Sequence, residues 1–149
     1  MFRRLSIALV VALAVLPGAA AADWSLDKGD DWVVTRAQSG AVTIDLRCSR
    51  NMPGRLQMTL TGRDFPPVSA VMLWIALPGG GLARHSVDVE KEGAALYGPW
   101  LVSDLVLDQF RQGSALEIDM PSRGGEDIAS VGMAGTGAAR IAMQERCGF

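Results

Sequence analysis

Histidine and cysteine are scarce in this 149-residue sequence, which holds one histidine, His85, and two cysteines, Cys48 and Cys147. A Ser/His/Asp hydrolase would need His85, yet its neighbour Ser86 cannot complete a triad with it, because adjacent strand residues point to opposite faces. The Gly-x-Ser-x-Gly nucleophile elbow is also missing. A zinc or copper site lacks ligands, since there is no second histidine and the cysteines are far apart in the sequence. The sequence therefore predicts no metal and no cofactor, and it argues against a serine-hydrolase mechanism.

Motifs that would bind calcium or phosphate are lacking as well. Asp27, Asp30 and Asp31 have neither the ligand spacing nor the closing glutamate of an EF-hand loop. The run Pro78-Gly79-Gly80-Gly81 has no Gly-Lys-Ser/Thr ending, so it is interpreted as a hairpin turn and not as a phosphate loop. We expect the three aspartates to form a solvated acidic segment.

Paired carboxylates leave a hydrolase as the alternative function. Glu90 with Glu92, or Glu117 with Asp119, would lie on one face of a strand. Glycoside hydrolysis needs two acids about 5–10 Å apart across a cleft, and a single strand does not form a cleft. A hydrolase that uses such a pair or His85 is therefore kept as the alternative, and a non-catalytic function is preferred.

The N-terminus has the three parts of a secretory signal peptide. Met1-Phe2-Arg3-Arg4 is followed by the apolar run 5–16 and then by small residues up to Ala22. A membrane span needs about 20 apolar residues, so this run is too short to stay as an anchor. We predict a signal peptide at 1–22, with cleavage before Asp23 or one residue earlier, and a location in the periplasm or outside the cell. A buried N-terminal helix is the structural alternative.

The remaining chain, 23–149, is expected to be one domain without a membrane anchor. Its 127 residues can bury a hydrophobic core, and no repeat or linker divides them. Loss of the two signal arginines leaves 12 basic and 16 acidic residues, a net charge of −4. Binding of nucleic acid relies on a basic surface, so this balance argues against nucleic acid as a partner.

The two cysteines are predicted to form one intramolecular disulfide. In an oxidising compartment, two cysteines allow a single pairing, Cys48 with Cys147. In the chain-entropy model, the bridge would restrict the unfolded chain and stabilise the folded protein by roughly 4–5 kcal/mol. Free thiols and an intermolecular bridge are the alternatives that the sequence leaves open.

Alternating polar and apolar residues predict most of the fold as strands. In 41–48, apolar residues alternate with Thr43, Asp45 and Arg47, which places Cys48 on the core side. The stretch 68–77 is the most apolar part of the domain and is expected to be a central strand covered on both sides. Further strands are expected at 32–38, 56–60, 82–90, 94–97, 116–120 and 127–133.

Two short helices complete the predicted fold. Ser103 is a suitable N-cap for a helix over 104–112 that ends at Gly113. A second, alanine-rich helix is expected at 138–146, with Cys147 just past its end. With seven or eight short strands and two short helices, the chain is predicted to be mainly β, as an antiparallel β-sandwich or barrel.

The aromatic residues suggest one candidate binding edge. Tyr97 and Trp100 flank Gly98-Pro99 in a connection, and exposed aromatic side chains anchor interfaces because they bury a large area at low entropic cost. Packing of these two rings in the core is the preferred interpretation, and the exposed edge is the first choice among the binding candidates. Trp74, within the apolar stretch, is expected in the core.

Arginines gather in the sequence around one turn and give a second candidate. Arg50 and Arg55, with Arg47 and Arg63 on either side, form either a patch for an acidic partner or ordinary outward strand charges. The sequence leaves both interpretations open.

The C-terminal part of the chain resembles a known family. From Ser103 to Cys147, a short helix, Gly113, the strand residues Ala115-Leu116-Glu117-Ile118 and the run Met133-Ala134-Gly135-Thr136-Gly137-Ala138-Ala139 resemble small exported bacterial proteins of the invasion-associated locus B type. Trp74-Ile75-Ala76-Leu77-Pro78 is similar to the central strand of that family. The resemblance covers about half of 23–149. It implies a periplasmic, β-rich protein and no active-site residues to carry over.

The preferred function is an exported, non-catalytic binding or interaction module in the periplasm or outside the cell. An association with the bacterial envelope, and another envelope protein as the partner, are the hypotheses that this interpretation raises. The hydrolase with paired carboxylates or His85 is the alternative.

Overall fold

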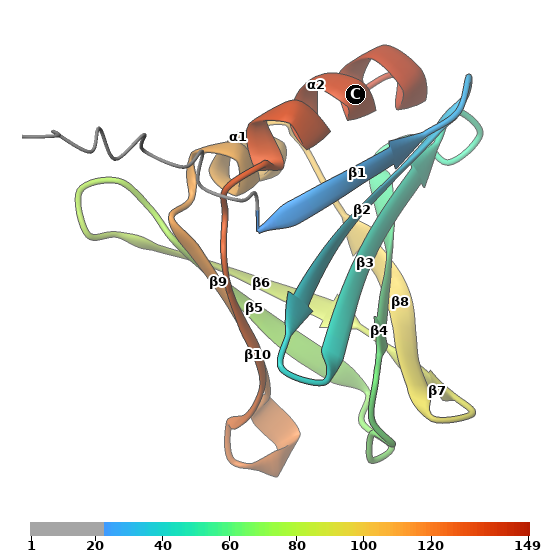
Figure 1. The fold of residues 1–149 in the computed structure, drawn as a ribbon. Helices are drawn as coiled ribbons and strands as arrows, with labels where there is room; N and C mark the ends of the chain where they lie inside the picture. The colour runs from blue at the N-terminus through green and yellow to red at the C-terminus, as the bar shows by residue number, and fades with distance from the viewer. Residues whose placement is uncertain (1–22) are drawn as a thin grey trace, which may run out of the picture.

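The computed structural model describes residues 23–149, and the predicted signal peptide at 1–22 lies outside the described residues. The strands form two antiparallel sheets, and the helices α1 (Asp104–Gln112) and α2 (Thr136–Cys147) lie together at one end of them (Figure 1). No helix of residues 23–149 is both long enough and apolar enough to cross a membrane.

The larger sheet has six strands in the order β1-β2-β3-β4-β8-β7. Hairpins join its first four strands. The chain then forms β5 and β6 of the smaller sheet before β7 and β8 complete the larger one. Its strands are β1 (Trp24–Lys28), β2 (Trp32–Ser39), β3 (Val42–Ser49), β4 (Arg55–Thr61), β7 (Glu90–Glu92) and β8 (Ala95–Leu101).

The smaller sheet has four strands in the order β10-β9-β5-β6. These are β5 (Ala70–Ala76), β6 (Leu82–Asp88), β9 (Ala115–Met120) and β10 (Glu126–Gly132), with a 3-10 turn at Pro121–Arg123 between the last two. The register of β9 against β10 shifts between Asp127 and Ala129, so that Ile128 is an extra residue in a β-bulge.

The core lies between the two sheets because apolar residues occupy alternate positions of nearly every strand. Fully buried residues from the larger sheet include Ile44, Leu46, Met58 and Leu60, and those from the smaller sheet include Leu73, Ile75, Leu116 and Ile118. Where the sheets approach at one edge, Ser39 of β2 donates a 3.0 Å hydrogen bond to the carbonyl oxygen of Ser130 in β10 and accepts one of 3.0 Å from its amide.

The prediction of a mainly β fold is confirmed in its sandwich form. Within residues 23–149, no strand of one sheet pairs in a ladder with a strand of the other, so the barrel form does not apply. The eight predicted strands are present, and two more, β1 and β7, were not predicted. Asp27 lies in β1, and Asp27, Asp30 and Asp31 are all exposed, as expected for a solvated acidic segment.

One expectation about the smaller sheet was wrong. β5 is an inner strand as predicted, but only one of its faces is buried, and Met72 and Trp74 are half-buried on the other. Trp74 therefore lies on the solvent side of β5 and is not a core residue. Its indole Nε1 donates a 2.9 Å hydrogen bond to Asp119 of β9.

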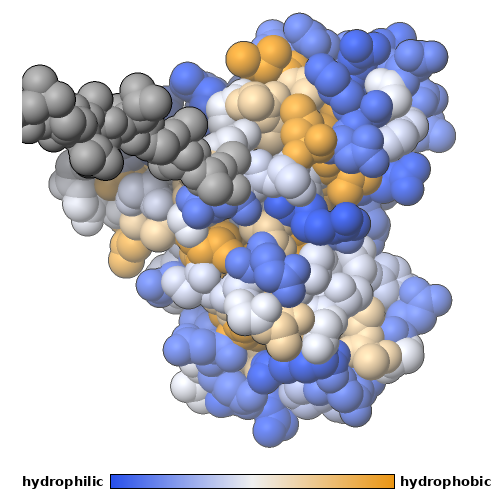
Figure 2. Space-filling view, in the orientation of Figure 1, coloured by the Kyte–Doolittle hydropathy of each residue, from blue (hydrophilic) through white to orange (hydrophobic). Residues whose placement is uncertain are grey.

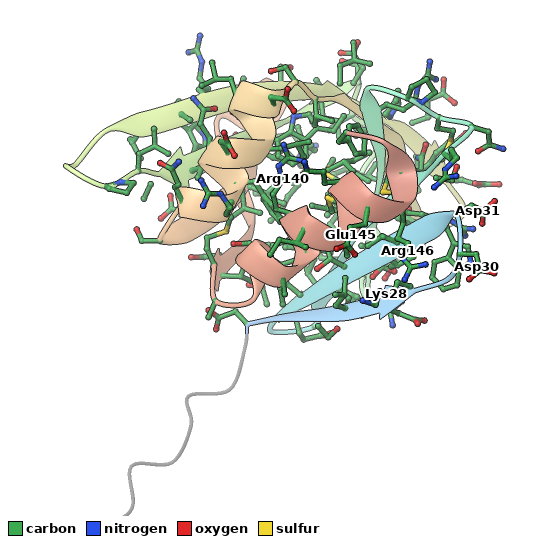
Figure 3. The ribbon with its side chains drawn as sticks, turned by 90° about the horizontal axis from the view of Figure 1, so that it is seen from above. Lys28, Asp30, Asp31, Arg140, Glu145 and Arg146 are labelled. Atoms are coloured by element: carbon green, nitrogen blue, oxygen red, sulfur yellow. A yellow bond between two sulfur atoms is a disulfide. The ribbon has the colours of Figure 1, made fainter. Side chains whose placement is uncertain are left out.

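Both predicted helices are present. Ser103 caps α1, and its hydroxyl accepts a hydrogen bond from the amide of Val106, while Gly113 follows the last residue of the helix. α2 begins two residues earlier than predicted and packs across β1, β2 and β3, and Figure 3 shows it from above, with Glu145 and Arg146 near the β1–β2 end of the sheet.

The predicted disulfide is confirmed. Cys48 of β3 and Cys147 are bonded, their Cα atoms are 6.0 Å apart, and both side chains are buried. Cys147 is the last residue of α2 and does not lie beyond its end. The bridge therefore fixes the C-terminal turn of the helix to the core face of the larger sheet.

Candidate binding face

The register of the larger sheet aligns two rows of side chains on its solvent side. Residues directly opposite each other in neighbouring strands lie on the same face, and the intervening row is the buried one. We call the residues of these two rows the outer face. The first row is Ser25, Arg36, Asp45, Thr59, Tyr97 and Glu90, and the second is Asp27, Val34, Arg47, Gln57 and Pro99.

One end of the outer face contains a hollow of about 310 Å³, here called the Trp32 hollow. The guanidinium carbon of Arg47 lies 5.7 Å from the centroid of the Trp32 ring, within the range of a cation–π contact. Trp32 also sits directly against Gly29, where any side chain would overlap the indole. The ring is therefore held between the backbone and a cation. The hollow is lined by Ser25, Leu26, Asp27, Trp32, Val34, Arg36 and Arg47.

The other end of the outer face contains a hollow of about 540 Å³, here called the Tyr97 hollow. The Tyr97 hydroxyl donates a 3.1 Å hydrogen bond to Glu90, and this bond, together with the charge of Glu90, raises the pKa of Tyr97. Gly98 allows the strand to pass close to the carbonyl oxygen of Asp88, which a side chain at this position would displace. The hollow is lined by Ser69, Asp88, Val89, Glu90, Tyr97, Gly98 and Pro99.

The centre of the outer face is polar and its charges are paired. Arg36 donates two hydrogen bonds to the Asp45 carboxylate, of 2.6 Å and 3.0 Å, and this partner raises the pKa of Arg36. Thr59 and Gln57 lie beside this pair, half-buried. The surface between the two hollows therefore offers hydroxyl, amide and guanidinium groups, with no large apolar area.

The structure separates the two aromatic residues of the predicted binding edge. Tyr97 is half-buried on the outer face, whereas Trp100 is only 1% exposed and packs against Phe110 with ring centroids 6.3 Å apart. Trp100 therefore follows the core interpretation and forms no part of an exposed edge. Residues 95–101 form a strand, and residues three apart in a strand point to opposite faces, so only Tyr97 faces solvent.

The four arginines do not form a single patch. Arg50 and Arg55 are exposed at the two ends of the β3–β4 connection, and Arg55 continues the solvent side of β4. Arg47 stacks on Trp32, and Arg63 lies beyond the opposite end of β4, with its guanidinium carbon 4.9 Å from the centroid of Phe65. Of these four arginines, only Arg47 and Arg55 therefore belong to the solvent side of the larger sheet.

His85 lies apart from the outer face. It is half-buried in β6, its Nε2 is 3.0 Å from Oε1 of Gln109 in α1, and its ring is 5.6 Å from that of Trp100. Burial lowers the pKa of His85, and the hydrogen bond to Gln109 offsets part of that effect. These contacts join β6 to α1.

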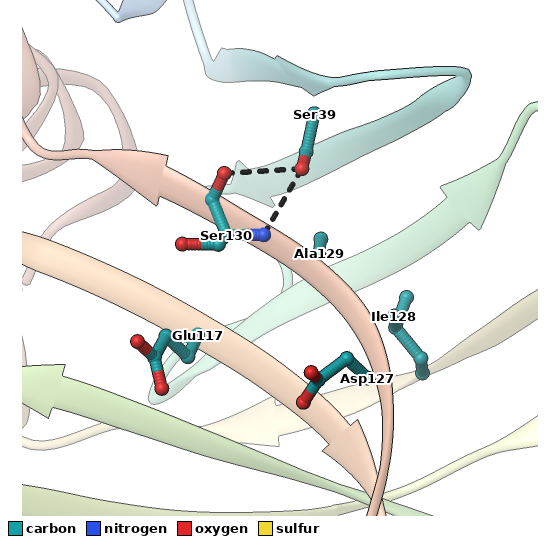
Figure 4. Close-up of a pocket in the computed structure, with 6 residues that line it drawn as sticks. All are labelled: Ser39, Glu117, Asp127, Ile128, Ala129 and Ser130. Atoms are coloured by element: carbon teal, nitrogen blue, oxygen red, sulfur yellow. Dashed lines mark hydrogen bonds between the residues drawn. The ribbon is translucent and has the colours of Figure 1, made fainter.

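The two carboxylate pairs of the hydrolase alternative lie on different sheets, because Glu90 and Glu92 are in β7 of the larger sheet and Glu117 and Asp119 are in β9 of the smaller one. Glu117 and Asp119 share the solvent side of β9 as expected, and Glu117 and Asp127 line a hollow of about 300 Å³ (Figure 4). Ser39 and Ser130 border it, and their hydrogen bonds to each other close the sandwich. Within residues 23–149, no group of three or more histidine, cysteine or acidic side chains could hold a metal ion.

The register between the strands of the larger sheet cannot be predicted from the local sequence pattern. The alternation in β3 already placed Asp45 and Arg47 on the solvent side. Which residues flank them on β2, β4 and β8 depends on pairings between distant segments, so the Trp32 hollow was not predicted.

The fold and the site define a disulfide-tethered, two-layer antiparallel β-sandwich with an open polar outer face. No protein-family model and no curated protein sequence matches the chain. Among solved structures, the chain is similar to the crystal structure of invasion associated protein B from Bartonella henselae, with a TM-score of 0.54 and 17% sequence identity. The match covers 85% of this chain and 97% of that one. At this identity the likeness shows the fold, and it confirms the predicted resemblance at that level.

Proposed function

We propose that this protein is an exported, non-catalytic binding module of the bacterial envelope or its surroundings, and that the outer face is its binding surface. The observation that carries the proposal is the outer face itself: two aromatic-walled hollows on one open side of a sandwich, joined by a polar strip. Binding sites commonly combine apolar walls with a few oriented polar groups. Another envelope component is the proposed partner.

Export is supported by the disulfide and by the N-terminal sequence. Disulfides persist in oxidising compartments such as the periplasm and are rare in the cytosol. The intact mass of protein recovered from a periplasmic extract should correspond to a chain that starts at Asp23, or at Ala22 if the alternative site is cleaved. A full-length chain in the inner membrane would contradict the proposed processing.

The non-catalytic assignment is supported by the structural contacts of His85. Its Nε2 is engaged by Gln109, and its ring packs beside Trp100, so His85 connects structural elements. The variants His85→Ala and Glu117→Gln should therefore keep the cellular phenotype of the parent. A complete loss of phenotype in either stably folded variant would favour the hydrolase alternative.

Site-specific photo-crosslinking in cells tests the binding surface. A photoreactive residue replaces Thr59 in the first row of the outer face, and, as the matched control, Ser86 on the solvent side of β6. The position at Thr59 should give a defined adduct in the periplasmic fraction, and the control should not. No adduct at Thr59, or the same adducts from both positions, would overturn the outer face as the binding surface.

A further inference from the structure

We infer that the outer face binds an uncharged oligosaccharide chain, laid across the strands from the Trp32 hollow to the Tyr97 hollow. This inference rests on the proposed function and names the chemical class of the ligand. It follows from three properties of the outer face: the separation of its two aromatic rings, the neutral polar groups between them, and its charge balance.

The two rings are too far apart for one small molecule. Trp32 and Tyr97 are separated by three strand spacings, from β2 through β3 and β4 to β8, and by about four residues along the strands. With strands about 4.8 Å apart and about 3.3 Å per residue, the separation is roughly 20 Å. A ligand that reaches both hollows must therefore be extended, and a chain of repeating rings can place one ring in each.

The groups between the hollows suit a ligand rich in hydroxyls. Thr59 and Gln57 lie side by side on β4, and each can donate and accept hydrogen bonds. Gln57 makes one hydrogen bond of 3.4 Å, to the neighbouring carbonyl oxygen of Met58. Sugar rings present hydroxyls along their edges and C–H groups on their faces, so the edges match this polar strip and the faces match the aromatic walls.

The charge balance argues for an uncharged ligand. Two arginines and three acids give the outer face a net charge of −1, and Arg36 is bonded to Asp45. A polyanion such as nucleic acid or a phosphate-rich headgroup needs an excess of cations. A stable protein interface has an apolar core of buried anchors, which the polar centre of the outer face does not provide. A neutral glycan needs neither an excess of cations nor an apolar core of buried anchors.

The aromatic walls are already fixed before binding. Trp32 is held by Gly29 and Arg47, and Tyr97 is held by its hydrogen bond to Glu90. Fixed groups lose little conformational entropy when a ligand binds, so the rings can contribute most of their contact energy to affinity.

The test uses the oxidised protein, expressed from its full sequence, and two probes of equal length. The first probe is a neutral hexamer of N-acetylglucosamine, and the second is an anionic hexamer of galacturonic acid. Titration calorimetry and tryptophan fluorescence should detect binding of the neutral hexamer. The affinity should change little between about 50 mM and about 500 mM salt, since salt screens only charged contacts.

Matched variants localise the binding. Trp32→Leu and Tyr97→Ala should each weaken binding of the neutral hexamer by about tenfold or more, as expected for aromatic anchors. Trp74→Leu is the control, because Trp74 is also a half-buried indole on a sheet face, with Arg84 5.8 Å from its ring centroid, and it should bind like the parent. If Trp32→Leu fails to fold, Gln57→Ala is the deciding variant and should also weaken binding.

Failure of this inference can be told from failure of the proposed function. No binding of the neutral hexamer, stronger and salt-dependent binding of the anionic one, or equal effects of Trp74→Leu and Trp32→Leu would overturn the glycan assignment. If the photoreactive residue at Thr59 then gives a protein adduct in cells, the outer face is a binding surface for a protein. If Thr59 gives no adduct at all, the proposed function fails as well.

Discussion

The two faces of the larger sheet come from the same strands and differ completely in chemistry. On the inner side, β3 and β4 carry Ile44, Leu46 and Met58, which are fully buried. On the outer side, the same strands carry Asp45, Thr59 and other polar residues. The period-2 pattern needed for a core therefore leaves every second position of the sheet free for another use. One segment can therefore encode a buried core and a separate polar surface in alternate residues.

β8 shows this contrast over four residues. Tyr97 faces the solvent beside the Tyr97 hollow, and Trp100 is buried between α1 and β6. Substitutions on the two sides should therefore differ in their effect on the free energy of unfolding.

Truncation of Trp100 should have the largest effect. Trp100→Ala removes a large buried ring and leaves a cavity next to Phe110 and His85, so the free energy of unfolding should fall by about 3–5 kcal/mol. Urea unfolding of the oxidised protein measures the change. A loss below about 1 kcal/mol, the range of ordinary substitutions, would show that the inner side is not a tightly packed core.

Removal of the disulfide should come next. Replacing Cys48 and Cys147 with alanine should lower the free energy of unfolding by about 2–5 kcal/mol, because the unfolded chain gains conformational freedom. Limited proteolysis should then cut α2 first, since a short helix needs tertiary contacts to persist. Unchanged melting and unchanged cleavage would contradict this account of how α2 is held.

A smaller effect is expected from His85 as the pH changes. Burial lowers the pKa of His85 below its ordinary value of 6.5, so the unfolded chain binds its proton at a higher pH than the folded protein does. Stability should therefore be complete above about pH 6.5 and fall as the pH drops toward the lower folded pKa. Urea midpoints at about pH 7.5 and about pH 5 should differ less in His85→Gln than in the parent. An identical pH dependence would show that His85 does not contribute.

The smallest effect on stability is expected from Tyr97. Tyr97→Ala removes a half-buried ring and a hydrogen bond to the exposed Glu90, so the free energy of unfolding should change by no more than about 0.5 kcal/mol. Measured beside Trp100→Ala, this variant gives the comparison directly. A loss similar to that of Trp100→Ala would mean that the Tyr97 side is structural and is not reserved for binding.

Much of the fold could be predicted from the sequence, because local patterns determine most of its elements. The alternation around Cys48, the cap at Ser103 and the single cysteine pairing gave a strand, a helix and the bridge. β1 and β7 were missed for a common reason. Only Trp24 is buried in β1, and all three residues of β7 are exposed. These strands are held by pairing with β2 and β8, and not by their own hydrophobic pattern.

The site was less predictable than the fold. Tyr97 and Trp100 are close in sequence and look equivalent there, and only the assignment of 95–101 as a strand separates them. Trp74 shows the converse error, because an apolar stretch indicates burial but not which residues of a two-sided strand face an uncovered side. The partners of Arg47 and Tyr97 on the outer face depend on register, which segments far apart in the chain decide together.

The contacts that join the two sheets connect residues far apart in the sequence, and this separation affects the rate of folding. Trp24 donates its indole N–H to the carbonyl oxygen of Gly132, 108 residues away, and Ser39 bonds to Ser130, 91 residues away. Such distant pairings slow folding, because loop-closure entropy is lost before the contacts compensate for it. The N-terminal strand β1 and the C-terminal strand β10 are therefore expected to form their native contacts together. Hydrogen exchange should accordingly detect one cooperative unit, in which β1 and β10 become protected in the same kinetic step during refolding.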